Sequence, residues 1–191
     1  MNTLIVNLFG APGAGKSTIS AYIFALLKMR GYNCELVTEF AKDKVWEENK
    51  AALSNQLYVF GQQSFRISRV NGQVDVIITD SPLPLSLMYG NSAKLGESFA
   101  ETVMADFNSY NNMNLYINRV KDYNPVGRIQ TEEESDKKGF EILNLLIQKD
   151  IPFRLVNGDE NGCEEILSLV EYCLKHPGTD WTEDTDIDTD K

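Results

Sequence analysis

Short apolar segments recur along the chain, and each is followed by a longer segment with helical periodicity. The short segments lack regular polar positions, as is typical of strands that are buried on both faces of a parallel sheet. They predict five strands, at residues 3–9, 34–38, 74–79, 114–118 and 153–156. Strands of this kind need a layer of helices on each face, so the segments between them decide the fold class.

The segments between the predicted strands carry apolar residues three and four positions apart. In the first of them Ile19, Ile23 and Leu27 share one helical face. Helices are predicted at residues 17–30, 40–48, 51–70, 95–110, 132–149 and 164–174. Strands that alternate with helices indicate βαβ units. The sequence therefore predicts an α/β fold, in which a five-stranded parallel sheet lies between two layers of helices.

The end of the chain departs from this alternation. Residues 176–191 hold six acidic residues against Lys191, which gives this segment half of the formal net charge of −10. A segment with so few apolar residues cannot bury enough surface to fold alone. We therefore expect one folded domain, residues 1–175, followed by an acidic and disordered tail, residues 176–191.

Cysteine usage and hydropathy favour a cytoplasmic location. Cys34, Cys163 and Cys173 are odd in number and widely spaced, so they fit neither a disulfide framework nor a metal site. No apolar run reaches the roughly 20 residues that span a membrane. The first ten residues lack a basic start and a cleavage site, and they indicate a strand rather than a signal peptide. The acidic chain has no general affinity for nucleic acid, because such affinity comes mainly from Lys and Arg.

The most specific motif follows the first predicted strand. Residues 10–17 read Gly-Ala-Pro-Gly-Ala-Gly-Lys-Ser, which fits the phosphate-binding P-loop pattern G-x-x-x-x-G-K-[ST] in full. Glycines let the backbone curl so that several N–H groups face one anion, and the following helix adds its positive dipole end. Lys16 is expected to reach the outer phosphates of ATP, and the Ser17 hydroxyl to bind Mg²⁺.

This match and its strand–loop–helix setting disfavour a glycine-rich turn that binds nothing. The predicted ATP-binding residues of the loop are Gly10, Ala11, Pro12, Gly13, Ala14, Gly15, Lys16, Ser17 and Thr18.

A carboxylate ends the third predicted strand. In P-loop enzymes an Asp at this place typically holds the Mg²⁺ shell, often through water, so Ser17 and Asp80 form the predicted metal site. The alternative is that Asp80 only starts the turn before Ser81 and Pro82, which is a common role for Asp. The nearby P-loop favours the metal role.

A second carboxylate, Glu39, ends the second predicted strand. Ligands of open parallel sheets lie beyond the carboxyl ends of the strands, so Glu39 and Asp80 are expected to face the same crevice as the P-loop. A carboxylate near the γ-phosphate can accept the proton of an attacking hydroxyl. Glu39 is therefore either a catalytic base or the cap of the next helix. Lys42 and Asp43 are further candidates for an acceptor pocket.

Arginines near the fourth predicted strand suit phosphoryl transfer. Arg119 follows the strand, and Arg128 lies in a loop, residues 121–128, that also contains Lys121. Arginine matches the charge that spreads over the phosphoryl oxygens in the transition state, and a basic loop that closes over ATP would exclude water. We predict that Arg119 binds ATP and that Arg128 is catalytic. The alternative is that both are solvated surface residues.

The helix at residues 51–70 carries polar residues on one face. Gln62 and Arg66 are one helical turn apart and share that face. They either contact the acceptor or form a solvated helix surface.

These segments resemble the nicotinamide riboside kinase-like P-loop proteins. The resemblance spans residues 4–158 and rests on the P-loop, on Glu39, and on residues 79–82, 127–128 and 131–134. Residues 37–43 and 118–134 are also similar to small phage-encoded kinases of the AAA-type ATPase group. Some related phage kinases act on 5-hydroxymethyl pyrimidines in DNA.

The resemblance has implications for fold and chemistry. It implies the strand order 2-3-1-4-5 and a mobile lid between strands four and five. It implies that Lys16, Ser17, Asp80 and Arg128 match functional positions of the family and that Glu39 acts as the base. It also implies the host cytoplasm as the location, if the chain is encoded by a phage.

The leading interpretation is a kinase that uses ATP and Mg²⁺ to phosphorylate a hydroxyl on a nucleoside-like acceptor. The acceptor is either a free nucleoside or nucleotide, or a modified pyrimidine in DNA; the acidic charge disfavours DNA. One alternative is an ATPase or nucleotide-dependent switch, but Ser81 stands where many ATPases place a second acidic residue after Asp80. A binding module with a degenerate site is disfavoured by the intact Lys16 and Ser17. No membrane partner is expected, and the sequence predicts no oligomeric state.

Overall fold

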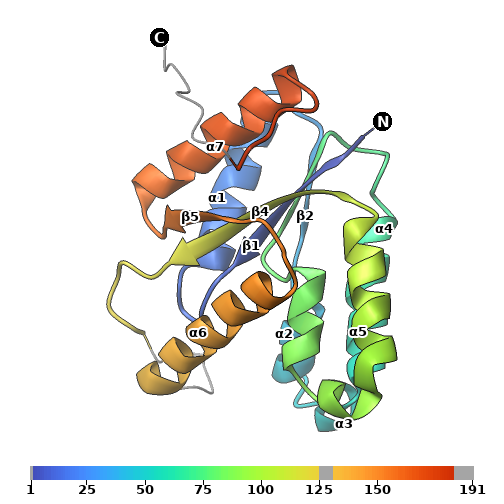
Figure 1. Cartoon of the computed structure of the whole chain (residues 1–191). Coiled ribbons are helices and arrows are strands. Elements are labelled where there is room, and N and C mark those ends of the chain that lie inside the picture. Colours follow the sequence, from blue (N-terminus) through green and yellow to red (C-terminus); the bar gives the residue numbers. More distant parts are fainter. Residues whose placement is uncertain (1, 125–130, 183–191) are drawn as a thin grey trace.

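The structure, a computed structural model, describes residues 2–124 and 131–182. Its strands form one parallel sheet in the order β2-β3-β1-β4-β5 (Figure 1). They are β1 (Leu4–Phe9), β2 (Cys34–Val37), β3 (Val76–Thr79), β4 (Asn111–Asn118) and β5 (Arg154–Asn157). The predicted α/β fold and its strand order 2-3-1-4-5 are confirmed, and the arrangement is that of a three-layer, P-loop NTPase-like fold.

Helices cover both faces of this sheet. They are α1 (Lys16–Met29), α2 (Phe40–Trp46), α3 (Lys50–Ser54), α4 (Gln56–Ser68), the 3₁₀-helix η1 (Leu83–Met88), α5 (Ser92–Asn108), α6 (Glu132–Gln148) and α7 (Glu160–Lys175). Within the described residues, none of these helices has the length and apolar character needed to cross a membrane.

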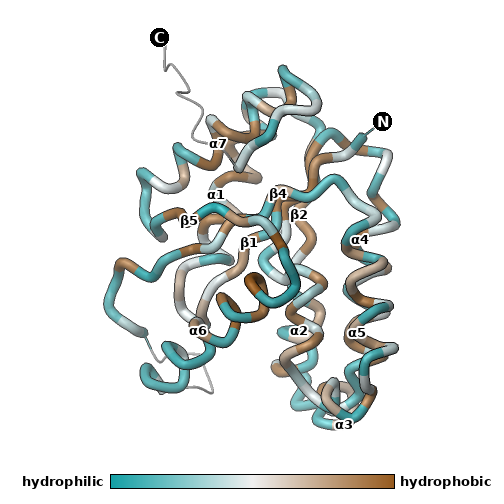
Figure 2. The backbone as a smooth tube through the Cα atoms, viewed as in Figure 1, coloured by the Kyte–Doolittle hydropathy of each residue, from teal (hydrophilic) through white to brown (hydrophobic). Residues whose placement is uncertain are grey.

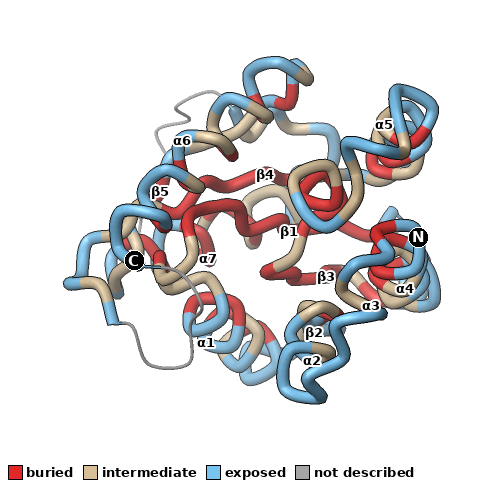
Figure 3. Tube along the Cα trace, turned by 90° about the horizontal axis from the view of Figure 1, so that it is seen from below, coloured by how far each residue is buried: buried red, intermediate tan, exposed pale blue. Residues whose placement is uncertain are grey.

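Strand β1 lies in the middle of the sheet and contributes to two cores, one on each face. Leu4, Val6 and Leu8 pack in the core that α1 and α7 cover. Ile5 and Phe9 pack in the core that α4, α5 and α6 cover. Figure 2 shows hydrophobic residues along the strands, and Figure 3 shows the central strands buried between helices with exposed outer sides. Burial on both faces explains why β1 is apolar except at Asn7.

The helix predicted at residues 51–70 is wrong in one respect, because the structure divides it at Asn55. The Asn49 side chain accepts a hydrogen bond from the Ala52 N–H and starts α3, and Asn55 accepts one from the Tyr58 N–H and starts α4. Each asparagine satisfies backbone donors that a helix start leaves unpaired. The periodicity of the apolar residues continues across this break and conceals it.

Strand β4 begins three residues before the predicted start, because its first part is polar. The Asn7 side-chain amide donates to Asn112 Oδ1 at 2.9 Å and to Asn114 Oδ1 at 3.0 Å. Asn7 and Asn114 are both buried, and the asparagines satisfy one another inside the sheet. Because the first residues of β4 are asparagines, the start of this strand lacks the apolar pattern by which the other strands were predicted.

The described chain continues beyond the predicted domain boundary at residue 175. The Thr179 N–H donates to the His176 carbonyl oxygen, and the half-buried Trp181 packs against the core under α1 and α7. The last part of the predicted tail, residues 183–191, lies outside the described residues.

We expect Trp181→Ala to lower the free energy of unfolding by about 1 kcal/mol, because the substitution removes part of the apolar surface that this core covers. Urea denaturation of the full chain measures the change. Trp46→Ala is the matched control, since Trp46 is 74% exposed. Equal effects of the two substitutions would show that Trp181 does not stabilise the fold.

Candidate functional site

The P-loop joins β1 to α1 beyond the carboxyl end of the central strand. Gly10, Gly13 and Gly15 have φ angles of 140°, 86° and 95°, which L-amino acids with a side chain rarely adopt. Gly15 offers no side-chain cap to α1, and the first turn of that helix carries no acidic residue. The N–H groups at the start of α1 are therefore available to an anion, as a phosphate site requires.

Lys16 lies across this loop. Its Nζ donates to the carbonyl oxygens of Gly10, at 2.8 Å, and of Ala11, at 3.0 Å. Ser17 and Thr18 follow in the first turn of α1 and are exposed. The structure thus brings the predicted loop residues 10–18 together in one strand–loop–helix turn.

Ser17 and Asp80 meet although they are far apart in the chain. The Ser17 hydroxyl donates to Asp80 Oδ2 at 2.5 Å, and Asp80 directly follows β3. Asp80 is only 7% exposed, and its other oxygen, Oδ1, is buried without a hydrogen-bond partner. A buried, unpaired carboxylate oxygen is costly, so this atom is suited to a ligand.

These atoms fit Mg²⁺. The Ser17 oxygen keeps its lone pairs while its proton bonds to Asp80, and Asp80 Oδ1 can accept from a water molecule of a metal shell. Among the residues that the structure describes, no group of three or more His, Cys, Asp or Glu could hold a metal ion. A site with two protein oxygens would therefore depend on phosphate and water for its remaining ligands.

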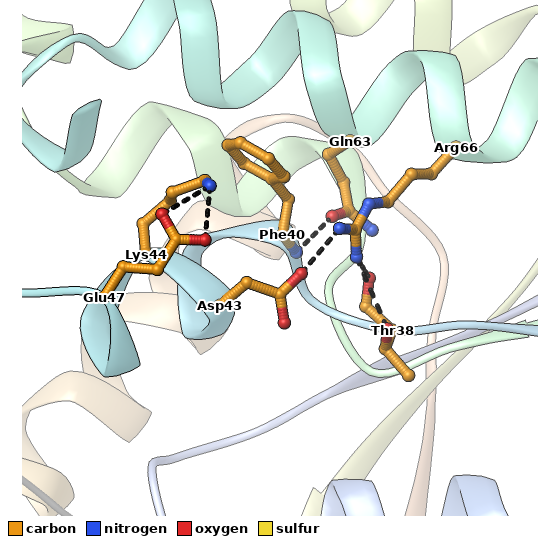
Figure 4. Close-up of polar contacts among 7 residues, drawn as sticks. All are labelled: Thr38, Phe40, Asp43, Lys44, Glu47, Gln63 and Arg66. Atoms are coloured by element: carbon orange, nitrogen blue, oxygen red, sulfur yellow. Dashed lines mark hydrogen bonds and ion pairs between the residues drawn. The ribbon is translucent and has the colours of Figure 1, made fainter. Parts of the chain in front are cut away.

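Glu39 occupies the N-cap position of α2, but its side chain makes no capping hydrogen bond. The first amide of the helix, the Phe40 N–H, donates instead to Gln63 Oε1 at 2.9 Å (Figure 4). Gln63 is 4% exposed and reaches this place from α4. The interpretation that the Glu39 side chain caps α2 is therefore wrong, because that side chain makes no capping hydrogen bond.

The surroundings of Glu39 favour its protonated form. Burial raises the pKa of the carboxyl above its ordinary value of 4.5, and the charge of Asp80 raises it further. Lys16 and Lys42 act on the same pKa in the opposite direction. Glu39 thus shares its electrostatic environment with the P-loop lysine and with the predicted metal site. A carboxylate with a raised pKa is the stronger proton acceptor once it is ionised.

Asp43 and Arg66 bind each other. Arg66 Nη2 donates to Asp43 Oδ2 at 2.6 Å, and Nη1 donates to the Thr38 carbonyl oxygen at 3.2 Å (Figure 4). The guanidinium carbon also lies 5.2 Å from the centre of the Phe40 ring. Arg66 therefore holds α4 against the start of α2, a structural role that neither sequence interpretation included.

Tyr89 is a neighbour of Glu39 that the sequence did not indicate. Burial of its hydroxyl raises the pKa of Tyr89 to about 12, and the charges of Glu39 and Glu141 contribute. The residue is still 39% exposed, and Lys138 Nζ lies 5.2 Å from the centre of its ring. Tyr89 follows η1, which has no periodic pattern, so the sequence carried no signal for its position.

Arg119 points to the start of α6. Its Nη2 atom lies 3.2 Å from Glu132 Oε1 and 2.5 Å from Asp136 Oδ1, and Nη1 donates to Ser135 Oγ. The side chain is 15% exposed, so Arg119 is not a solvated surface residue. Its predicted contact with ATP stays a prediction. Arg128, the predicted catalytic arginine, lies outside the described residues.

We expect Glu39→Gln to stabilise the folded chain at neutral pH, because the substitution removes a buried charge. A raised folded-state pKa means that the folded state loses stability relative to the unfolded state as the pH rises from the ordinary value of 4.5 through the folded value. The gain in melting temperature should therefore disappear below pH 4.5.

Thermal unfolding between pH 4 and pH 8 measures this dependence. Glu35→Gln is the matched control, because Glu35 is exposed on β2, the strand that precedes Glu39. A gain that is independent of pH would contradict the assignment of a raised pKa to Glu39.

Comparison with known proteins gives a structural likeness but no family. No protein family matches the sequence. Among solved structures, the chain resembles the crystal structure of APE1195, with a TM-score of 0.49 and 18% sequence identity. The match covers 90% of this chain and 96% of APE1195. A likeness at this level carries no functional information, so the function has to be inferred from the site.

Proposed function

We propose that the chain is an ATP-dependent kinase that transfers the γ-phosphate to a hydroxyl of a nucleoside-like acceptor. The observation that carries the proposal is the position of Glu39. Glu39 is half-buried, lies within electrostatic reach of Asp80 and Lys16, and makes no capping hydrogen bond in the helix that it precedes. A base at this place can accept the proton of an acceptor hydroxyl while the P-loop holds ATP.

The P-loop supports the nucleotide part of the proposal. The first turn of α1 and the loop glycines offer backbone donors to the phosphates, and Lys16 would exchange the Gly10 and Ala11 carbonyl oxygens for phosphate oxygens. Mg²⁺, when bound near Ser17 and Asp80, would neutralise charge on the transferred group. The protein residues position the reactants and exclude water.

The acceptor side is supported by Tyr89. A half-exposed aromatic ring within electrostatic reach of Glu39 is suited to stack on the planar base of a nucleoside. The resemblance to nicotinamide riboside kinase-like proteins favours the same class of acceptor, which includes free nucleosides, nucleotides and 5-hydroxymethyl pyrimidines in DNA. The net charge of −10 favours a small molecule over DNA.

A measurement of ADP release across nucleosides, mononucleotides and DNA with modified pyrimidines tests this function. We expect release to depend on one class of acceptor and to fall by at least about 10²–10³-fold in Lys16→Ala, because this lysine neutralises phosphate charge. The far-UV circular dichroism spectrum of Lys16→Ala, compared with that of the wild type, controls for loss of the fold. Release of ADP without any acceptor would indicate an ATPase or a switch and would contradict the kinase proposal.

Two substitutions separate the roles of the carboxylates. Glu39→Gln should reduce transfer by about 10²–10⁴-fold and leave the magnesium midpoint unchanged, because the amide cannot take a proton. Asp80→Asn should raise the magnesium midpoint by about 10–100-fold, because it weakens the metal shell. Magnesium titrations at saturating ATP, with the acceptor found in the screen, measure both effects.

The controls are Glu35→Gln and Asp75→Asn, which change carboxylates on β2 and just before β3, away from the carboxyl edge of the sheet. If Glu39→Gln shifts the magnesium midpoint and Asp80→Asn does not, the two roles are exchanged. If neither variant changes the rate by more than a few-fold, Glu39 is not the base.

A further inference from the structure

The start of α6 is bound directly to the P-loop. The Ser135 hydroxyl donates to the Pro12 carbonyl oxygen at 2.6 Å, across 123 positions of sequence. Ser135 is fully buried, at 0% exposure. A part-buried hydrogen bond of this length in the middle of a phosphate-binding loop constrains the loop backbone before any nucleotide arrives.

Arg119 fixes the orientation of that hydroxyl. A hydroxyl has one proton, which Ser135 gives to Pro12, so its lone pairs accept the hydrogen bond from Arg119 Nη1 at 3.2 Å. Glu132 and Asp136, one turn apart on α6, hold the other end of the guanidinium. Pro12, Ser135, Arg119 and the two carboxylates thus form one chain of contacts.

A second contact between α6 and the P-loop lies one turn further along the helix, at Gly139. A Cβ on Gly139 would lie 3.2 Å from the Ala11 Cβ and 3.0 Å from the Tyr116 hydroxyl. The Tyr116 hydroxyl also donates to the Gly139 carbonyl oxygen at 3.2 Å. Helix α6 therefore lies against the P-loop at two successive turns, and a side chain at position 139 would crowd the second contact.

The start of α6 is itself fixed. The Thr131 hydroxyl accepts from the Glu134 N–H, and the Glu134 carboxylate accepts from the Thr131 N–H, which forms a capping box. This places Ser135 in the first turns of a well-terminated helix. The side chain that contacts Pro12 is consequently held from a rigid element.

The geometry of a peptide bond connects these contacts to phosphate binding. The bond between Pro12 and Gly13 is trans, so the Pro12 C=O and the Gly13 N–H point in opposite directions within one plane. Because Ser135 holds the carbonyl on the α6 side, the Gly13 N–H must face away from α6. Pro12 has no N–H of its own, so Gly13 supplies the donor at this place in the loop.

We propose that Ser135 and Arg119 are positioning residues of the phosphate-binding loop, which aim the Gly13 N–H at a bound phosphate. Ser135 sets the plane of the Pro12–Gly13 peptide, and Arg119 holds the Ser135 hydroxyl in the orientation that does so. The proposal rests only on the ATP-binding part of the proposed function. It assigns Arg119 a role through Ser135 in place of a direct contact with ATP.

Calorimetric titration of Ser135→Ala with Mg-ATP and with Mg-ADP tests the role of Ser135. We expect the dissociation constants of both nucleotides to rise by about 5–100-fold, the equivalent of losing one buried hydrogen-bond partner. Ser64→Ala is the matched control, because Ser64 Oγ donates to Asp106 at 2.6 Å between two helices away from the P-loop. Affinities of Ser135→Ala within twofold of the wild type would overturn the proposal.

Hydrogen exchange of the ligand-free chain gives a second readout. The Ala14 N–H donates to the Ala11 carbonyl oxygen inside the loop, so its protection reports the order of the loop. We expect faster exchange over residues 10–18 in Ser135→Ala and unchanged exchange there in Ser64→Ala. If the wild type binds no ATP, the proposed function fails, and this experiment still decides the role of Ser135.

The combined variant Glu132→Gln with Asp136→Asn tests the role of Arg119. If Arg119 acts through Ser135, loss of its two partners should weaken the binding of ATP and of ADP by a similar factor of a few-fold. If Arg119 binds the γ-phosphate directly, removal of the competing carboxylates should strengthen the binding of ATP more than that of ADP. Stronger binding of ATP, or no change for either nucleotide, would overturn the positioning role.

Discussion

Tight backbone packing around the P-loop is the constraint on which the rest of the site depends. A Cβ on Gly10 would lie 2.7 Å from the Ile117 carbonyl oxygen, and a Cβ on Gly158 would lie 2.5 Å from that of Ala14. The loop is therefore enclosed by the ends of β4 and β5, and glycine alone permits this approach. Because the neighbouring strands fix its path, the loop donors are oriented before a phosphate binds, and little reorganisation is needed when it does.

Two carboxylates, Glu39 and Asp80, lie within electrostatic reach of each other, and their repulsion costs the folded state free energy. Glu39 and Asp80 lie close enough to raise the pKa of Glu39, and burial adds to the same effect. Lys16 and Lys42 offset part of this cost. Gln63 satisfies the Phe40 N–H, one of the backbone donors that the start of α2 leaves unpaired. The Glu39 side chain makes no capping hydrogen bond to α2, so its carboxylate is not committed to the helix start, as a proton acceptor requires.

The sequence predicted those parts of the molecule that local pattern determines. Apolar periodicity predicted the five-stranded parallel sheet, and the resemblance to P-loop kinases implied its strand order. The P-loop pattern predicted residues 10–18, and the carboxylate at the end of the third strand was predicted to lie with Ser17. The sequence did not predict the contacts of Gln63, Tyr89 or Ser135, since these join residues 23 to 123 positions apart in the sequence. No local pattern encodes such contacts. Helix boundaries failed for a related reason at Asn55, where a cap interrupts a continuous apolar face.

The position of Arg119 also has an electrostatic consequence for the loop. The start of α6 is acidic, with Glu132, Glu133 and Glu134 in its first turn, and it contacts the loop through Ser135. Without a cation between them, these carboxylates would repel the phosphates of a nucleotide at short range. Arg119 binds Glu132 and Asp136 on one side and Ser135 on the other, so its charge lies on the path between the acidic turn and the loop. Acidic residues favour the start of a helix, and Arg119 allows α6 to keep them while lying against an anion-binding loop.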